Sequence, residues 1–224
     1  MNKEIKVLFI GNSYTFFNEM NKILENICAS SDKFVITTLI TRGGARLDGY
    51  SNHNTQSGMK VQEELKNGYD YVFLQEQSNL PVVLRDKFFN SVRSLVSDIR
   101  NYGSTPILYE TWAKKAGHEA LKKYNLSVHD MEDGLFSAYE DIGKELDVKV
   151  SMVGRCFKYC VDNELFDCYN KDLSHPSEVG SFIIAMCHYY TIYGTLDDVN
   201  YLYKYDKKDL EEIKTIIKNS CVER

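Results

Sequence analysis

The sequence predicts an α/β domain of three layers, in which a doubly wound, five-stranded parallel sheet is covered by helices on both faces. Short apolar runs rich in β-branched residues alternate along the chain with longer segments whose apolar residues recur at helical spacing. The short runs are apolar at almost every position, which is typical of strands buried on both faces. The length of 224 residues suits one domain over residues 1–224.

Five segments have the character of buried strands. They are Ile5–Ile10, Phe34–Thr41, Tyr69–Gln75, Pro106–Tyr109 and Val148–Val153. Right-handed crossovers between successive strands would give a flavodoxin-like domain. Functional groups in such sheets gather at the carboxyl ends of the strands, so the residues that directly follow each strand are the candidates for a site.

Helical spacing of apolar residues predicts the connecting segments. The helical stripes are Phe16–Ile27, Phe88–Ile99, Met131–Leu146 and Val179–Met186, with a short helix over Met59–Lys66. Residues 45–58 are polar and contain glycine, which predicts a long surface loop. Residues 205–224 are expected to form a peripheral C-terminal segment with a helix over Asp209–Ser220.

The charge and the N-terminal residues narrow the class of protein. The net charge is −5, which argues against nucleic acid or an anionic membrane as partner, because both favour basic surfaces. No segment approaches the ~20 apolar residues of a membrane-spanning helix, and the first residues do not resemble a signal peptide. We therefore expect a cytoplasmic protein; the sequence carries no signal for an oligomeric state.

The six cysteines are scattered and form no Cys-x-x-Cys pair. Free thiols are expected in a chain of this size without a signal peptide. Cys156, Cys160, Cys168 and His175 have a spacing that matches no usual zinc site, and the cysteines lie in an amphipathic stretch. We interpret them as core thiols and expect no metal.

Ser13 lies where the first predicted strand turns into a helix, in the stretch FIGNSYT. One interpretation is an N-cap, whose hydroxyl accepts a hydrogen bond from a backbone N–H of the first turn. The other is a nucleophile, because a serine N–H at a helix start can stabilise a developing oxyanion.

His175 is the histidine best placed to act as a base for Ser13. It precedes Pro176, a residue favoured in the first turn of a helix, so it lies on the loop that enters that helix. Asp172 can accept a hydrogen bond from its Nδ1–H and leave Nε2 free to take a proton. The alternative is a plain helix-entry loop, with Asp172 or Ser174 as the cap.

These two stretches together resemble the SGNH, or GDSL-like, hydrolases. FIGNSYT resembles the first block of that superfamily, with Asn12 where many members have Asp, and implies that Ser13 is the nucleophile. RGGARL resembles the second block and implies that Gly44 donates its N–H to the oxyanion hole. DLSHPS resembles the last block and implies that Asp172 and His175 complete the triad.

The third block departs from the family pattern. The usual Gly-x-Asn-Asp is replaced by YVFLQEQSNLP, which is similar to a Gln-Gly-Glu-Ser-Asn string of some carbohydrate esterases. The resemblance implies that an amide from this stretch joins the N–H groups of Ser13 and Gly44 in the oxyanion hole. We expect Gln75 to take this role, with Gln77 and Asn79 as alternatives.

The resemblance implies an esterase that hydrolyses a small ester, such as an O-acetylated carbohydrate, through an acyl-enzyme and without a metal or organic cofactor. The expected substrate contacts are Asn12, Gln77, Glu110, Trp112, Arg46 and His53. Acyl transfer to a sugar would use the same triad. Two alternatives are a catalytically silent carbohydrate-binding relative and an FMN-binding module, which would leave Asp172 and His175 without a role.

Overall fold

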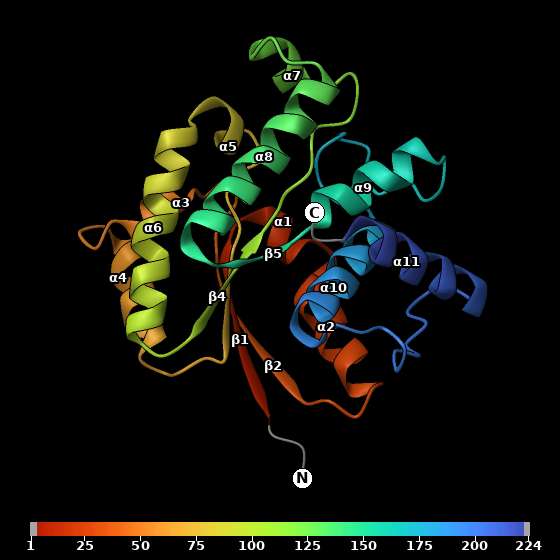
Figure 1. Ribbon diagram of the computed structural model, residues 1–224, viewed down its shortest axis with the longest axis horizontal. Helices are drawn as coiled ribbons and strands as arrows, with labels where there is room; N and C mark the ends of the chain where they lie inside the picture. The colour runs from red at the N-terminus through yellow and green to blue at the C-terminus, as the bar shows by residue number, and fades with distance from the viewer. Residues whose placement is uncertain (1–3, 222–224) are drawn as a thin grey trace.

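The computed structural model describes residues 4–221, and its central feature is the predicted parallel sheet. The strands run in the order β2-β1-β3-β4-β5, and every neighbouring pair is parallel. Their bounds are β1 (Ile5–Gly11), β2 (Val35–Thr41), β3 (Tyr71–Leu74), β4 (Thr105–Tyr109) and β5 (Lys149–Ser151). β1 lies between β2 and β3, and its carboxyl end points away from the N-terminus of the molecule (Figure 1).

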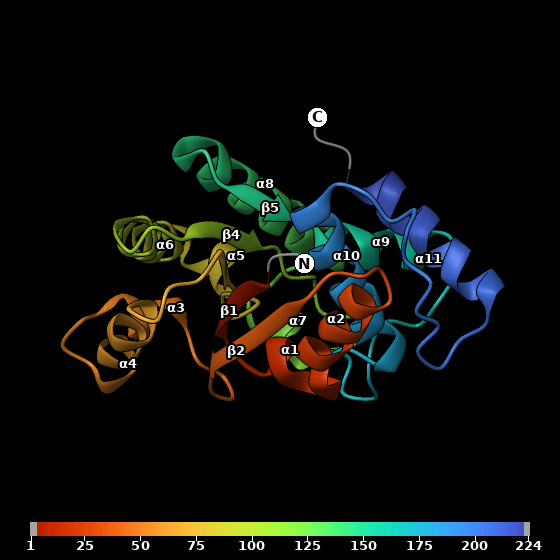
Figure 2. The ribbon, with the colours of Figure 1, turned by 90° about the horizontal axis from the view of Figure 1, so that it is seen from below.

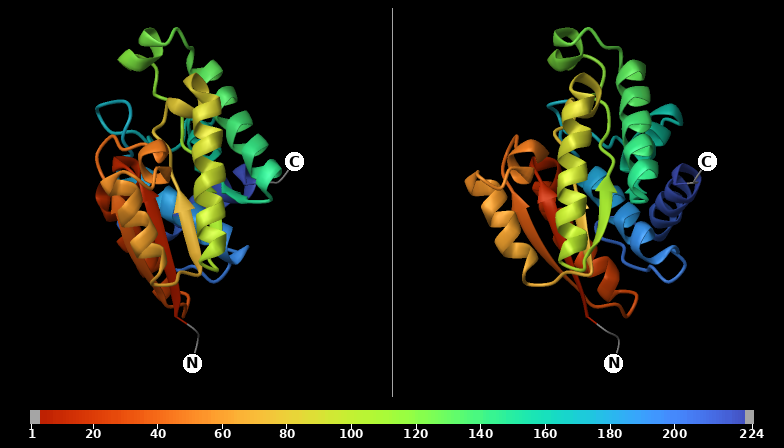
Figure 3. Two further views of the ribbon diagram at one scale, coloured as in Figure 1. Left: turned by 90° about the vertical axis from the view of Figure 1, so that its left-hand side faces the viewer. Right: turned by 60° about the vertical axis from the view of Figure 1, so that its left-hand side comes forward.

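Helices form a layer on each face of the sheet (Figure 2). One layer contains α2 (Met20–Ala29), α9 (Val153–Asp162), α10 (Glu178–Tyr193) and α11 (Lys207–Ser220). The other contains α3 (Leu47–Ser51), α4 (Gln56–Leu65), α6 (Arg85–Asn101) and α8 (Val128–Leu146). The short helices α1 (Ser13–Phe16), α5 (Leu80–Val83) and α7 (Glu119–Lys123) follow the carboxyl ends of β1, β3 and β4. In Figure 3, the green α7 lies at the end of the molecule opposite the N-terminus.

The sheet separates two hydrophobic cores. Val7 and Phe9 of β1 enter the core beneath α2 and α10, whereas Leu8 and Ile10 enter the core beneath α3 and α6. All four side chains are at most 1% exposed. Burial on both faces explains why β1 is apolar at every position from Val7 to Ile10, and it confirms the predicted three-layer class.

Several boundaries differ from the prediction. The expected loop over residues 45–58 is wrong, because α3 and the start of α4 lie within it. Leu47 and Tyr50 have polar neighbours in the sequence, but both are buried in the core beneath α3 and α6. Thr55 caps α4 by accepting a hydrogen bond from Gly58 N–H. The helix predicted from Phe16 is interrupted by the 3-10 turn η1 (Phe17–Glu19), where Asn18 has a positive φ of 51°.

The C-terminal helix packs on α9 and α10. Its buried residues Leu210, Ile213 and Ile217 join the same core as β1 and α10, and α11 is the outermost helix of that layer (Figure 2). Residues 222–224 of the predicted C-terminal segment lie outside the described residues. None of the helices within residues 4–221 combines the length and the apolar character needed to cross a bilayer.

Candidate active site

The corner between β1 and α1 is capped by Asn12, the residue before Ser13. The Asn12 side chain accepts a hydrogen bond from Tyr14 N–H at 3.1 Å, and its extended backbone conformation (φ −135°) is usual for an N-cap. Ser13 is therefore the first residue of α1, and its hydroxyl is not used for capping. This arrangement leaves the Ser13 side chain, half-buried at the carboxyl end of β1, available for another partner.

That partner is His175. The Ser13 Oγ and His175 Nε2 atoms are 2.8 Å apart, and His175 Nδ1 lies 2.5 Å from Asp172 Oδ2. The other carboxylate oxygen of Asp172 accepts hydrogen bonds from the backbone N–H groups of Ser174 and His175. Burial opposes ionisation of Asp172, but its hydrogen bonds with the His175 side chain and with these N–H groups prevail and lower its pKa. The carboxylate thus remains charged beside the imidazole.

The His175 loop is fixed from both sides. Asn170 N–H donates to His175 O at 2.7 Å, and an antiparallel bridge pairs Tyr169 with Pro176. Across the site, Asn18 Nδ2 donates to Pro176 O at 3.1 Å. The Phe17 ring stacks on the His175 ring with centroids 4.4 Å apart. The irregular turn η1 therefore places the Phe17 ring against the imidazole of His175.

A buried cluster of Tyr14, Trp112, Lys114 and Ser174 lies behind the imidazole. Tyr14 stacks on Trp112 with centroids 4.4 Å apart, and the Tyr14 Oη and Ser174 Oγ atoms are separated by 2.7 Å. Lys114 Nζ donates to both hydroxyls. Trp112 Nε1–H donates to Ser174 O at 2.9 Å. Trp112 is fully buried, so it supports the histidine loop and presents no surface to a substrate, contrary to the expectation.

Gln75 lies beneath the β1–α1 corner with both ends of its amide occupied. Its oxygen accepts hydrogen bonds from Asn12 N–H at 2.8 Å and Thr15 Oγ at 2.9 Å, and its nitrogen donates to Glu76 O. A Cβ on Gly11 would approach this oxygen to 2.6 Å, so glycine is needed for the close contact. The expected role of Gln75 as an oxyanion donor thus conflicts with the bonds that its amide already makes.

Gln77 is oriented differently. Its side-chain oxygen accepts a hydrogen bond from Asn79 N–H at 3.1 Å, and its amide nitrogen has no hydrogen-bond partner within residues 4–221. The neighbouring Glu76 accepts from the backbone N–H groups of Gln77 at 2.6 Å and Leu47 at 3.1 Å. Burial raises the pKa of Glu76 to about 7, although these N–H groups oppose the shift. Glu76 therefore connects the loop after β3 to the loop after β2.

Gly44 lies in the exposed loop after β2, with a positive φ of 66° that glycine adopts without strain. Asn12 Nδ2 donates to Ala45 O at 3.0 Å and thereby ties this loop to the β1–α1 corner. Neither Ser13 N–H nor Gly44 N–H has a partner among the described residues. Arg46 is half-buried and pairs with Asp48 at 3.1 Å; both line a cavity of about 110 Å³ that also borders Gly44.

Two further predicted substrate contacts lie elsewhere. Glu110 is fully buried and accepts hydrogen bonds from Arg155 N–H and Nε at 3.2 and 3.3 Å. Burial raises the pKa of Glu110 to about 8, whereas Arg155 opposes the rise. His53 Nε2 lies 2.8 Å from the carboxylate of Asp98, near the end of α6 that leads to the amino end of β4. Glu110 thus anchors α9, and His53 lies away from the carboxyl ends of the strands.

Sequence reasoning missed the residues that hold the histidine loop. Tyr14, Phe17 and Asn18 directly follow the predicted nucleophile, but the apolar spacing there indicates an ordinary helix. Lys114 is 6% exposed, and nothing in its local sequence distinguishes it from the half-buried Lys115. The only available signal was position, since Lys114 comes shortly after a strand whose carboxyl end faces the site.

Known structures of the same fold include several described as hydrolases. A candidate SGNH hydrolase from Slackia heliotrinireducens is 29% identical, with a TM-score of 0.77 over 85% of this chain and 100% of its own. A DUF4886 family protein from Bacteroides uniformis is 18% identical, with a TM-score of 0.81 over 97% and 94% of the two chains. An acetyl xylan esterase from Geobacillus stearothermophilus is 15% identical, with a TM-score of 0.62 over 88% and 98%.

This chain therefore has the three-layer α/β/α fold of the SGNH-like hydrolases, as the sequence predicted. No protein-family model matches the chain, and no curated protein matches it.

Proposed function

We propose that this chain, which has the fold of the SGNH-like hydrolases, is a serine esterase. The observation that carries the proposal is the 2.8 Å contact between Ser13 Oγ and His175 Nε2, with Asp172 on the other imidazole nitrogen. In the first step, His175 Nε2 takes the hydroxyl proton while Ser13 Oγ attacks the ester carbonyl. His175 then gives that proton to the leaving alcohol. Water repeats the sequence on the acyl-enzyme and releases the acid.

Three donors are proposed to stabilise the tetrahedral oxyanion. The N–H groups of Ser13 and Gly44 are supported by their lack of partners in the described residues. We assign the role of third donor to Gln77 and no longer to Gln75. The amide oxygen of Gln77 is fixed by Asn79 N–H, while its nitrogen remains available. A preorganised donor of this kind contributes about 2.7–4 kcal/mol to transition-state stabilisation.

The proposed substrate is a small ester, with an O-acetylated carbohydrate as the first choice. An acetyl xylan esterase among the structures of the same fold supports this class. Asn12 is 3% exposed and bound to Ala45 O, so we assign it a positioning role and not a substrate contact.

The test is hydrolysis of p-nitrophenyl acetate by the wild type and by the variants Ser13→Ala and His175→Ala. We expect each substitution to lower kcat by at least about 10³-fold, because removing one triad member leaves only the oxyanion hole and substrate binding. A fluorophosphonate should label Ser13 in the wild type, which would separate an esterase from a silent carbohydrate-binding relative.

Matched controls are available on the surface of the chain. Ser97 is exposed on α6, and His129 is exposed on α8, so Ser97→Ala and His129→Ala should keep wild-type rates. Activity that persists in folded Ser13→Ala protein, or labelling of a serine other than Ser13, would refute the proposed triad.

A further inference from the structure

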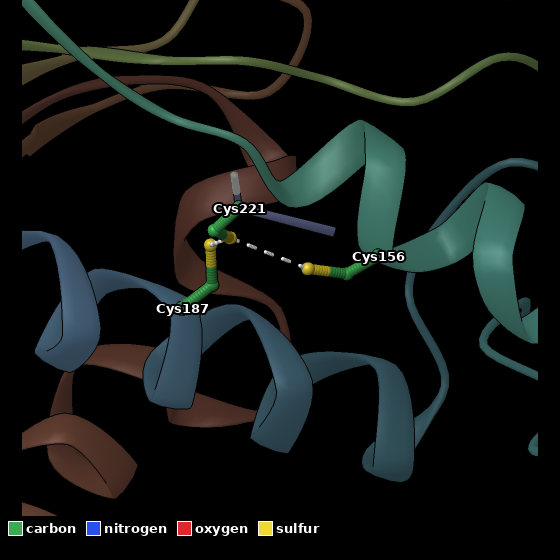
Figure 4. A group of neighbouring side chains, drawn as sticks. All are labelled: Cys156, Cys187 and Cys221. Atoms are coloured by element: carbon green, nitrogen blue, oxygen red, sulfur yellow. Dashed lines mark hydrogen bonds between the residues drawn. The ribbon is translucent and has the colours of Figure 1, made fainter. Parts of the chain in front are cut away.

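Three thiols that are distant in sequence meet on the α9–α10–α11 side of the molecule. Cys156 comes from α9, Cys187 from α10, and Cys221 directly follows α11. Figure 4 shows their sulfur atoms pointing toward one another from these three segments. The Cys187 and Cys221 sulfurs are 3.6 Å apart, those of Cys156 and Cys221 are 4.0 Å apart, and all three lie within 4.8 Å of one another.

These separations match those of sulfur ligands around one metal ion. Three thiolates at the usual zinc–sulfur distance of about 2.3 Å in tetrahedral geometry would be about 3.8 Å from one another. The observed 3.6 and 4.0 Å bracket that value, so small side-chain rotations would bring three sulfurs onto one ion. From positions in the sequence, we considered Cys156 together with Cys160, Cys168 and His175 and expected no metal; the structure brings Cys156 instead to Cys187 and Cys221.

The cluster has a route to solvent. Cys156 and Cys187 are buried, whereas Cys221 is half-buried and lines an open cavity of about 390 Å³ together with Lys149, Met152 and Tyr190. A cation can therefore reach the cluster from the side of Cys221.

We propose that Cys156, Cys187 and Cys221 form a binding site for a thiophilic d¹⁰ cation of the zinc group. The three sulfurs lose their protons to solvent as they bind, and the fourth coordination position faces the cavity that Cys221 lines. Bound metal would fasten the end of α11 to α9 and α10. The site is separate from Ser13 and His175, so it goes beyond the proposed esterase function.

The experiment is a titration of the metal-free full chain with Cd²⁺, in the presence of a phosphine that keeps the thiols reduced. We expect a thiolate-to-metal charge-transfer band that saturates at one equivalent of Cd²⁺, together with release of the protons that the three sulfurs carried. The melting temperature should rise with Cd²⁺, because the ion binds only the folded chain. Hydrolysis of p-nitrophenyl acetate should not require the metal.

Cys187→Ser and Cys221→Ser should each weaken Cd²⁺ binding by more than about 100-fold, since loss of an outer-shell contact alone costs 10- to 100-fold in metal affinity. Cys28→Ser and Cys160→Ser remove buried thiols outside the cluster and should keep the band. Cys221 is half-buried near the chain end, so Cys221→Ser provides the test if Cys187→Ser does not fold. A wild type without a band at one equivalent, or an unchanged band in folded Cys221→Ser, would overturn the proposal.

Discussion

The side-chain oxygen of Gln75 accepts a hydrogen bond from the backbone N–H of Asn12 at 2.8 Å. This bond fixes the residue before Ser13. It also occupies the side-chain amide of Gln75, the residue that we expected from the sequence to be an oxyanion donor. Gln77, two positions later, keeps its amide nitrogen available while Asn79 N–H holds its oxygen. The two amides therefore differ in their partners, because both ends of the Gln75 amide are bonded whereas the Gln77 nitrogen has no partner among the described residues.

We expect Gln77→Ala to lower kcat for p-nitrophenyl acetate by about 10²–10³-fold with little change in stability, because it removes one preorganised oxyanion donor. Gln75→Ala should instead lower the free energy of unfolding by about 1–3 kcal/mol, because it leaves the buried Asn12 N–H unpaired. Steady-state kinetics and urea unfolding of both variants distinguish the roles. Asn79→Ala tests the third candidate amide in the same two assays. An unchanged kcat in Gln77→Ala would mean that Gln75 or Asn79 is the oxyanion donor.

Lys114 contacts the histidine loop without touching the reacting atoms, so we assign it a positioning role. Its Nζ donates to Tyr14 Oη and Ser174 Oγ, and these hydroxyls also bond each other. Lys114→Met should lower kcat by about 10- to 100-fold at nearly constant KM, because small displacements of a catalytic group are costly. Lys115→Met is the matched control, since Lys115 pairs with Asp167 at the surface and should keep its kcat. Equal kinetics for the two variants would exclude the positioning role.

Glu76 should make stability depend on pH in a direction opposite to that of most carboxylates. Burial raises its pKa to about 7 in the folded chain, above the value near 4.5 expected when unfolded. Between these values the folded state holds more protons than the unfolded state, so stability falls as pH rises through this window. The loss should reach about 3–4 kcal/mol above pH 7, on the basis of about 1.4 kcal/mol per pKa unit.

The Glu76→Gln variant isolates this contribution, because its amide oxygen can still accept a hydrogen bond but cannot ionise. Urea unfolding of both proteins at several pH values from 4 to 8 should show the variant gaining stability relative to the wild type as pH rises. A constant difference across the series would mean that Glu76 is already ionised in the folded chain near pH 5.

The sheet could be predicted from the sequence because a strand that is buried on both faces needs a continuous local run of apolar residues. Leu8 and Phe9 enter different cores, so the run around them has to be apolar without interruption. Ser13 and His175 were predicted for a different reason, since both follow directly from motifs at the carboxyl edge, and their 2.8 Å separation agrees with that expectation.

The burial of that edge could not be predicted. Glu110 and Trp112 follow β4, as a rim residue should, but the Asp172–His175 loop and α9 cover them. The identity of the cap was also open, because Asn and Ser are both good N-caps and occupy consecutive positions. Only the tertiary bonds from Asn12 to Gln75 and Ala45 decide that Asn12 takes the cap and leaves the Ser13 hydroxyl to His175.

The last prediction concerns Asn12, because the oxygen of its side-chain amide needs a donor as partner and the nitrogen needs an acceptor. Its oxygen accepts from Tyr14 N–H at the start of α1, where an Asp carboxylate would serve equally well. Its nitrogen donates to Ala45 O at 3.0 Å, where an Asp oxygen would face a carbonyl oxygen. The side chain is 3% exposed, so water cannot relieve that repulsion.

Asn12→Asp should therefore lower the free energy of unfolding by about 1–3 kcal/mol, as expected for an unsatisfied buried group. It should also lower kcat, since displacing Ala45 moves the adjacent Gly44 N–H away from the proposed oxyanion position. Asn12→Ser keeps a capping oxygen without adding charge. It should therefore lower both the free energy of unfolding and kcat less than Asn12→Asp does. Urea unfolding and p-nitrophenyl acetate kinetics of the two variants give the comparison. An Asp variant as stable and active as the wild type would show that the hydrogen bond to Ala45 does not position the loop after β2.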